Sequence, residues 1–403
     1  MIRIRNARSV PIGLLCGAIA AAGLGYAVST PAQSKYMEVD EVKPGMKGYG
    51  LSVFSGHKPE KFDIEIISTV RNFQPGQSLH LAKSLHPRLE LARTVGGMSG
   101  SPCFIDGKMI GAYAYGWLYP VEPIIGITPI RNMLDDLARP VPRELLPGLR
   151  QAPLPGGNQP EGASARGAVP DKVATHRYKA GGDHSKRGLD YELRTHAQQV
   201  ALETGPTLKP PMNSGLQPAS TDIMLGGLSP TGVQLAAELL EPAGMTVLQA
   251  GGGGGDERRR RPFEDPPTSY EDGGVLAVQL VRGDMSVAGL GTVTHVVGDR
   301  LVGFGHPMLN GGIEALPAAN GHIHWIMASQ SRSFKLGEPT RPLGTLVNDR
   351  QASIVVDTTI EAPVFPVELK INGVLGAPKT NWQMEVSHDP FFAPSFVAVA
   401  FGS

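Results

Sequence analysis

The fold is decided by the stretch Val95-Gly96-Gly97-Met98-Ser99-Gly100-Ser101-Pro102-Cys103-Phe104-Ile105-Asp106-Gly107-Lys108-Met109-Ile110. Glycines on both sides of Ser99 adopt backbone angles that other residues resist. Such a turn exposes a serine Oγ while neighbouring N–H groups point at one spot. Acyl transfer requires both features, a nucleophile and hydrogen-bond donors for the oxyanion. The apolar pairs around Asp106-Gly107 indicate a β-hairpin. The residues alone leave two alternatives open: a tight Gly/Ser turn leading into a hairpin, or a nucleophile loop.

Short strands separated by frequent turns are expected on both sides of this stretch. Residues 61–70 alternate well, with Phe62, Ile64 and Ile66 on one face and charged residues on the other, which is typical of a half-buried strand. Similar patterns predict strands at 51–54, 77–82, 111–117, 124–130, 275–281, 291–297, 300–304, 323–327, 351–357, 365–371 and 382–386, and a helix at 130–137. This pattern favours a mainly β protein built as a small barrel or sandwich.

The composition is that of a globular chain with flexible connections. The 403 residues suffice for two or three domains, and 37 basic residues balance 37 acidic ones. The balanced charge gives no reason to expect nucleic acid or an anionic surface as a partner. Glycine and proline make up about a fifth of the chain, above the usual share of about 12%, and they are clustered.

The first 33 residues have the pattern of a secretory signal. Three arginines, at positions 3, 5 and 8, precede a small apolar run over 11–28, and Thr30-Pro31-Ala32 resembles a cleavage site. The alternative is an uncleaved membrane anchor, although the run is short and rich in glycine and alanine. The prediction is an exported protein, periplasmic or extracellular, with no span beyond this segment.

Composition divides the rest of the chain into five segments. They are a β-rich half at 34–150, a flexible linker at 151–220, a strand–helix–strand unit at 221–250, a Gly/Arg-rich tether at 251–273 and a second β-rich half at 274–403. Ser229 and Pro230 mark the expected start of the helix in the third segment.

Neither a disulfide nor a cofactor is expected. Removal of the signal would leave Cys103 as the single cysteine, best read as a buried apolar residue. Three histidines in the linker, at positions 176, 184 and 196, lack the close spacing of metal ligands. No metal and no organic cofactor is therefore predicted.

The serine stretch resembles a known family. Gly97–Pro102 is similar to the nucleophile loop of trypsin-like serine peptidases, usually Gly-Asp-Ser-Gly-Gly-Pro, and closer to the Gly-Met-Ser-Gly-Ser-Pro of SpoIVB-type peptidases, the stage IV sporulation protein B family. Residues 62–66, 105–112, 289–294 and 303–307 look like further blocks of this family. The resemblance implies a trypsin-like double β-barrel and a serine endopeptidase of narrow, regulatory substrate range, acting on a protein or peptide.

The resemblance also implies site residues. Ser99 matches the nucleophile and His306, in Gly305-His306-Pro307, matches the general base. The backbone N–H groups of Gly97 and Ser99 would form the oxyanion hole, by analogy with trypsin-like enzymes. The order differs from that of the family, in which the histidine half comes first, so the chain looks circularly permuted. A triad depends on geometry and not on chain order.

The expected acid is missing. The family has an aspartate fifteen residues before its serine, and the matching positions here hold Ser84 or His86. Asp63 is the first candidate for a replacement, and Asp106 and Asp349 are weaker ones; each also has an ordinary structural explanation. Loss of the acid costs about 10⁴ in kcat in a serine protease.

Three hypotheses therefore stay open. The chain is a serine endopeptidase with a Ser–His dyad or an unrecognised acid. Alternatively, it is an inactive peptidase-like barrel that binds peptides or cell-envelope partners. The third hypothesis is a protein that cleaves only its own linker, for example near Arg261.

Overall fold

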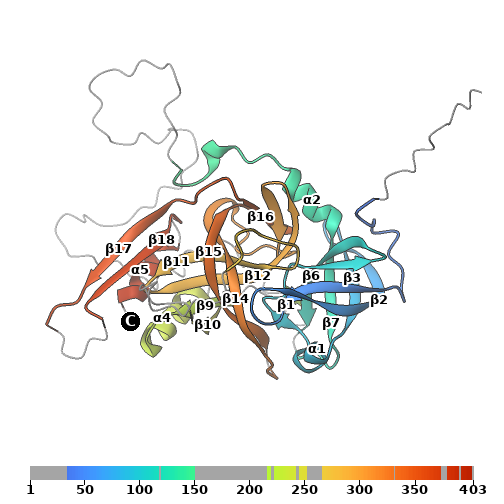
Figure 1. Ribbon diagram of the computed structural model, residues 1–403, viewed down its shortest axis with the longest axis horizontal. Helices are drawn as coiled ribbons and strands as arrows, with labels where there is room; N and C mark the ends of the chain where they lie inside the picture. Colours follow the sequence, from blue (N-terminus) through green and yellow to red (C-terminus); the bar gives the residue numbers. More distant parts are fainter. Residues whose placement is uncertain are drawn as a thin grey trace, which may run out of the picture. The chain divides into compact units, whose positions relative to one another are not determined.

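The computed structural model describes residues 34–117, 119–149, 216–218, 222–241, 245–251, 266–330, 332–373, 379–389 and 392–401. The predicted signal, most of the 151–220 linker with its three histidines, and the part of the tether that holds Arg261 lie outside these residues. The mainly β class is confirmed: the described chain forms a closed six-stranded antiparallel barrel and a second, larger sheet (Figure 1).

The first barrel is formed by the N-terminal half. Its strands, in the order in which they pair, are β5 (Ser101–Ile105), β1 (Lys47–Val53), β2 (Pro59–Gln74), β3 (Gln77–Leu85), β7 (Ile124–Pro129) and β6 (Lys108–Trp117). A β5–β6 pairing closes the ring. The predicted hairpin about Asp106-Gly107 is the β5–β6 turn. The inward face of β2 is the alternating set Phe62, Ile64 and Ile66, each at most 2% exposed.

The second sheet contains a ring of the same design. Its strands are β12 (Ser286–Val297), β13 (Arg300–Gly303), β16 (Ser353–Asp357), β15 (Ser333–Arg350), β14 (Gly312–Met327) and β11 (Val275–Gly283). All neighbours are antiparallel, and a β11–β12 pairing closes the ring. The expectation of a double β-barrel therefore agrees with the structure.

Further elements extend these barrels. They are α1 (Pro87–Ala92), β4 (Val95–Gly96), α2 (Ile130–Ala138), the 3-10 turn η1 (Arg143–Leu145), β8 (Leu216–Pro218), β9 (Asp222–Gly226), α4 (Pro230–Leu240), β10 (Thr246–Gln249), β17 (Val364–Lys370), β18 (Asn381–Ser387) and α5 (Ala393–Phe401). As predicted, Ser229 caps α4 with its hydroxyl and Pro230 opens the helix.

Three of the predicted segments contact the barrels. The predicted linker ends in β8, which pairs antiparallel with β6 at the edge of the first sheet. The strand–helix–strand unit is present, but it is not separate, because β9 pairs with β12 and continues the second sheet. Within the predicted tether, Asp272 accepts a hydrogen bond from the Val296 N–H at 2.9 Å, so its described end is part of the second barrel.

The two barrels share a core. A buried cluster joins Met109 and Ala112 of β6 and Met133 of α2 to Val302 and Val355 of the second barrel. In addition, β4, which immediately precedes the serine turn, pairs in parallel with the start of β15. This pairing holds the serine stretch against the second barrel.

Candidate active site

The turn that carries Ser99 lies between β4 and β5. Gly97 and Gly100 adopt φ angles of 84° and 96°, in the left-handed region that favours glycine. A Cβ at Gly100 would lie 2.0 Å from the carbonyl oxygen of Thr292 and 2.5 Å from the Phe304 nitrogen. Only glycine therefore allows this close approach of the turn to β12 and β13.

Strand β12 binds three carbonyl groups of the serine turn. The Thr292 hydroxyl donates to the Gly97 carbonyl at 3.1 Å. The Thr292 N–H donates to the Ser99 carbonyl at 2.8 Å. The Thr294 hydroxyl donates to the Gly100 carbonyl at 2.7 Å. The second barrel thus fixes the backbone on both sides of the serine.

His306 follows the predicted β12–β13 hairpin. Phe304 and Gly305 take φ angles of 68° and 73°, so two consecutive left-handed residues turn the chain before the histidine. The Thr128 hydroxyl, on β7 of the first barrel, donates to the Gly305 carbonyl at 2.6 Å. Each barrel therefore holds the loop of the other.

These loops bring Ser99 and His306 together. The serine Oγ lies 2.8 Å from the histidine Nε2, although the residues are 207 positions apart. Both side chains are only 1% exposed. This distance is within the range expected between a nucleophile and its general base.

The other ring nitrogen faces a backbone carbonyl. Nδ1 of His306 lies 2.7 Å from the Pro307 oxygen. A carbonyl oxygen only accepts hydrogen bonds, so Nδ1 must carry a proton. In a neutral ring Nε2 is then the acceptor for the Ser99 hydroxyl, which is the tautomer that base catalysis requires.

Asp349, near the end of β15, binds the loop after His306. Its carboxylate accepts N–H groups of Met308 at 2.8 Å, Leu309 at 2.6 Å and Asn310 at 2.8 Å. Burial raises the pKa of this carboxyl to about 6, against the opposing effect of these N–H groups. Asp349 is therefore ionised at neutral pH.

Asp349 and His306 contact opposite ends of one peptide unit. The Met308 N–H that donates to Asp349 and the Pro307 carbonyl that accepts from His306 belong to the same amide. A hydrogen bond to an anion makes the carbonyl of that amide a stronger acceptor. The carboxylate thus acts on the histidine across one peptide bond.

The other two carboxylates considered from the sequence lie elsewhere. Asp63 is exposed on β2, where its charge acts on His86. Asp106 is exposed in the β5–β6 turn. Of the three, the structure brings only Asp349 to the loop of His306. Cys103, as expected, is a buried residue, and burial raises the pKa of its thiol to about 12.

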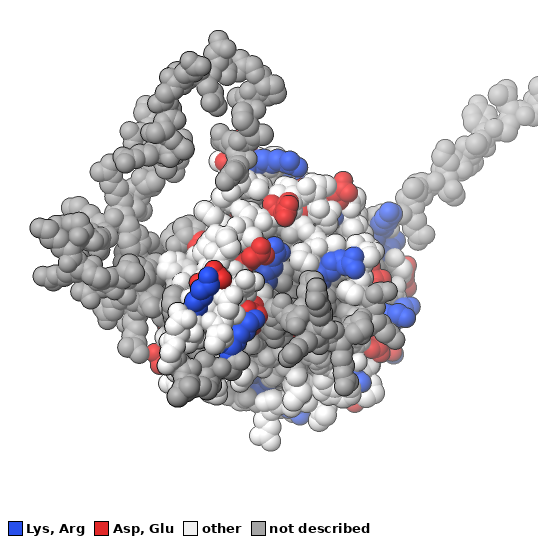
Figure 2. Space-filling view, turned by 60° about the vertical axis from the view of Figure 1, so that its left-hand side comes forward, with Lys and Arg blue, Asp and Glu red and all other residues white. Residues whose placement is uncertain are grey.

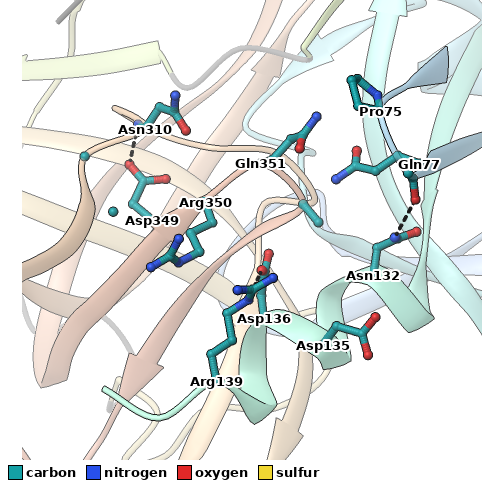
Figure 3. Close-up of a pocket in the computed structure, with 14 residues that line it drawn as sticks. Pro75, Gln77, Asn132, Asp135, Asp136, Arg139, Asn310, Asp349, Arg350 and Gln351 are labelled. Atoms are coloured by element: carbon teal, nitrogen blue, oxygen red, sulfur yellow. Dashed lines mark hydrogen bonds and ion pairs between the residues drawn. The ribbon is translucent and has the colours of Figure 1, made fainter. Parts of the chain in front are cut away.

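A cavity of about 450 Å³ lies behind the histidine loop (Figure 3). One wall is formed by Asn132 and Asp135 of α2 and by Arg139, which follows that helix, and the other includes Asn310 and Asp349. Its polar groups are largely paired within the protein: Asp136 with Arg139, Asn132 with the Gly76 carbonyl, and Asn310 with Asp349. Neither Ser99 nor His306 is part of its lining.

The rest of the described chain gives no further functional assignment. Within the described ranges there is no group of three or more His, Cys, Asp or Glu side chains that could hold a metal ion. None of the described helices has the length and hydropathy needed to cross a bilayer. On the face shown in Figure 2, basic and acidic side chains are interspersed.

Comparison of the chain with models of protein families, with curated proteins and with solved structures found no match in any of the three. The site is therefore interpreted from its own geometry.

Proposed function

We propose that this protein is a serine endopeptidase in which Ser99 is the nucleophile and His306 the general base. The observation that carries the proposal is the 2.8 Å contact between Oγ and Nε2, with the tautomer set by Pro307. Oγ would bond to the substrate carbonyl carbon while Nε2 takes the hydroxyl proton. That proton would pass to the leaving amine as the C–N bond breaks, and water would then hydrolyse the acyl-enzyme.

Asp349 is proposed as a positioning residue that replaces the missing acid. It fixes the Pro307–Met308 peptide, which in turn orients the imidazole and stabilises the imidazolium that forms during the reaction. Contact across a peptide is weaker than direct contact with a carboxylate. The expected rate is therefore between those of a complete triad and a bare dyad.

The edge of strand β6 supports the proposal that the substrate is an extended peptide. Past Tyr113, whose carbonyl binds the Gly100 N–H, β6 pairs with β8 through Tyr115, Gly116 and Trp117. The Tyr115 ring lies 6.3 Å from the ring of His306. Strand addition to an edge is a common way to bind peptides, and this edge adjoins the nucleophile. In this proposal, β8 occupies the substrate edge in the resting protein.

The family and the location are proposed on sequence grounds. The blocks around Ser99 and His306 support a permuted member of the SpoIVB-type peptidases. Residues 1–33 support export to the periplasm or the outside of the cell. N-terminal sequencing of the protein recovered from a periplasmic or medium fraction tests the second point; an intact Met1 in the membrane fraction would indicate an anchor instead.

Labelling with a fluorophosphonate probe tests the activity. Wild type, Ser99→Ala, His306→Ala and the matched control Ser55→Ala, at an exposed serine, are compared at equal concentration. We expect wild type and the control to be labelled and the two site variants to remain unlabelled. Unlabelled, folded wild type would contradict the proposal.

One observation favours the alternative of an inactive, peptide-binding barrel: Ser99 and His306 are each 1% exposed. That hypothesis predicts that a peptide binds with equal affinity to wild type and to Ser99→Ala, without turnover. Self-cleavage, the third hypothesis, predicts a shorter intact mass in wild type that is absent from Ser99→Ala.

A further inference from the structure

A fully buried lysine lies behind the serine turn, in a position that the proposed dyad does not use. Lys335, on β15, is 0% exposed. Its stem packs against the turn, since a Cβ at Gly97 would lie 3.1 Å from the Lys335 Cβ. A buried ammonium is costly unless it is hydrogen-bonded. Its partners therefore indicate what it does.

The amine donates to two hydroxyl groups. Nζ lies 2.8 Å from Ser52 Oγ on β1 and 3.3 Å from Thr292 Oγ1 on β12. Because an ammonium only donates, both hydroxyl groups must turn their own hydrogens elsewhere. The direction of every further bond follows from this.

One series of hydrogen bonds ends on the carbonyl before Ser99. Ser101 Oγ donates to the Met98 carbonyl at 2.7 Å, so in the 2.8 Å contact between the two hydroxyls Ser52 must be the donor to Ser101. The series is thus Lys335 to Ser52 to Ser101 to the Met98 carbonyl. A shorter series runs through the Thr292 hydroxyl to the Gly97 carbonyl.

The Met98 carbonyl and the Ser99 N–H belong to one peptide unit and point in opposite directions. Donation to the carbonyl fixes the N–H on the other side and makes it a stronger donor. The Ser99 N–H is one of the two groups that the family resemblance implies for the oxyanion hole. The ammonium also adds positive potential near the place where negative charge would form.

We propose that Lys335 is a positioning residue that polarises the oxyanion hole through Ser52, Ser101 and the Met98–Ser99 peptide. The inference rests on the proposed function, because an oxyanion forms only in acyl transfer. Burial lowers the pKa of the Lys335 amine to about 7, so the ammonium on which the proposal rests is lost as the pH rises through 7. A second buried charge lies near the turn: the Asp222 carboxylate packs against Gly96, where an added Cβ would lie 2.1 Å from its Oδ2. This carboxylate is paired with Arg332.

The first measurement is the Ser99 amide resonance in protein labelled with ¹⁵N-serine. It is made in the His306→Ala background, so that the histidine does not contribute, and the resonance is assigned by its loss in Ser99→Ala. We expect the amide proton to shift with a midpoint near pH 7, and this shift to disappear in Lys335→Met and to shrink in Ser101→Ala. A pH-independent Ser99 resonance would overturn the proposal.

The second measurement is the fluorophosphonate labelling rate of Lys335→Met, Ser101→Ala and Ser55→Ala with His306 intact. We expect a decrease of roughly tenfold for the first two, less than the about 10²–10³ for loss of a whole oxyanion donor, and none for the third. An unchanged rate in Lys335→Met would also overturn the proposal. If wild type is not labelled but the Ser99 resonance shifts with pH, the proposed peptidase function fails while the proposed effect of Lys335 on the Ser99 amide stands. If wild type is labelled but the resonance does not shift, the proposed effect of Lys335 fails while the peptidase function stands.

Discussion

The two barrels follow one plan of six antiparallel strands, yet they bury different groups. The first supplies the serine turn, and the hydrophobic cluster in its core includes the fully buried Phe62, Ile64 and Tyr113. The second supplies His306, and its strand β15 also carries two buried charges, Lys335 near one end and Asp349 near the other. Each charge is linked by hydrogen bonds to a peptide unit of one of these two loops, directly for Asp349 and through Ser52 and Ser101 for Lys335.

The two barrels therefore contribute different properties to the site. In the proposed mechanism, glycines of the first barrel set the backbone shape of the serine turn, whereas the buried charges of the second barrel act on both Ser99 and His306. A buried charge is tolerated when hydrogen bonds satisfy it, and β15 is held on both sides by β14 and β16. Variants that affect shape and variants that affect charge should therefore behave differently.

The largest effect is expected for the contact between the barrels. In Gly100→Ala the new methyl group would meet the Thr292 carbonyl and the Phe304 nitrogen, at an unfavourable φ. We expect a loss of about 3–5 kcal/mol in unfolding free energy and no fluorophosphonate labelling. Denaturant titration measures the first quantity.

Gly107→Ala is the matched control for this substitution. Gly107 has a φ of 76° but no atom near its Cβ position. It should therefore show only the conformational cost of about 1–2 kcal/mol. Equal losses in the two variants would mean that the barrels are not tightly joined at the serine turn.

The next effect concerns Asp349 and the labelling rate. In Asp349→Asn an amide NH₂ would face backbone N–H donors that now bind a carboxylate. We expect labelling to slow by about 10²–10³, less than the about 10⁴ for a directly bonded acid. Asp63→Asn, at the exposed carboxylate first suggested by the sequence, should label at the wild-type rate. The reverse ranking would restore Asp63 as the acid.

Asp349 also predicts how labelling depends on pH. Its folded pKa is about 6, above the usual value near 3.9, so the carboxylate is present above pH 6 and lost below it. Labelling of wild type should therefore decline as the pH falls through 6. The decline should be shallower in Asp349→Asn, which has no carboxyl group at this position; identical pH profiles would contradict this role.

The charge of Lys335 gives a smaller effect, on stability. Its folded pKa of about 7 lies below the unfolded value of about 10.4. Between these values the unfolded chain binds more protons at this side chain, so the contribution of Lys335 to the unfolding free energy should rise with pH. From pH 6 to pH 9 this group contributes about 2–3 kcal/mol.

Lys335→Met removes that contribution. The variant should therefore be stabilised relative to wild type by about 2–3 kcal/mol more at pH 6 than at pH 9, as measured by denaturant titration at both values. Lys43→Met, at an exposed position, should show the same difference from wild type at each pH. A pH-independent difference for Lys335→Met would mean that the ammonium is not penalised by burial.

Local pattern was sufficient to predict much of this arrangement. Alternation indicated β2, Gly298-Asp299 indicated the β12–β13 hairpin, and the resemblance of residues 303–307 to the histidine loop of a known family indicated His306. It did not indicate the charges of β15. Lys335 lies in a segment without regular alternation, and Asn348-Asp349-Arg350 is equally compatible with a turn. Their roles arise from barrel closure, which places Lys335 against β1 and β12 and Asp349 against a loop forty residues away.

The smallest effect tests the edge of β6. Because β8 pairs there through only three residues, replacing Leu216–Pro218 by three glycines removes little stability but weakens the strand. If β8 competes with substrate, labelling should become about 2–5-fold faster, since displacement of a three-residue strand costs about 1 kcal/mol, while Ser99→Ala with the same replacement stays unlabelled. Slower labelling would mean that β8 completes the site and does not block it, and β6 would then have no free edge for a peptide.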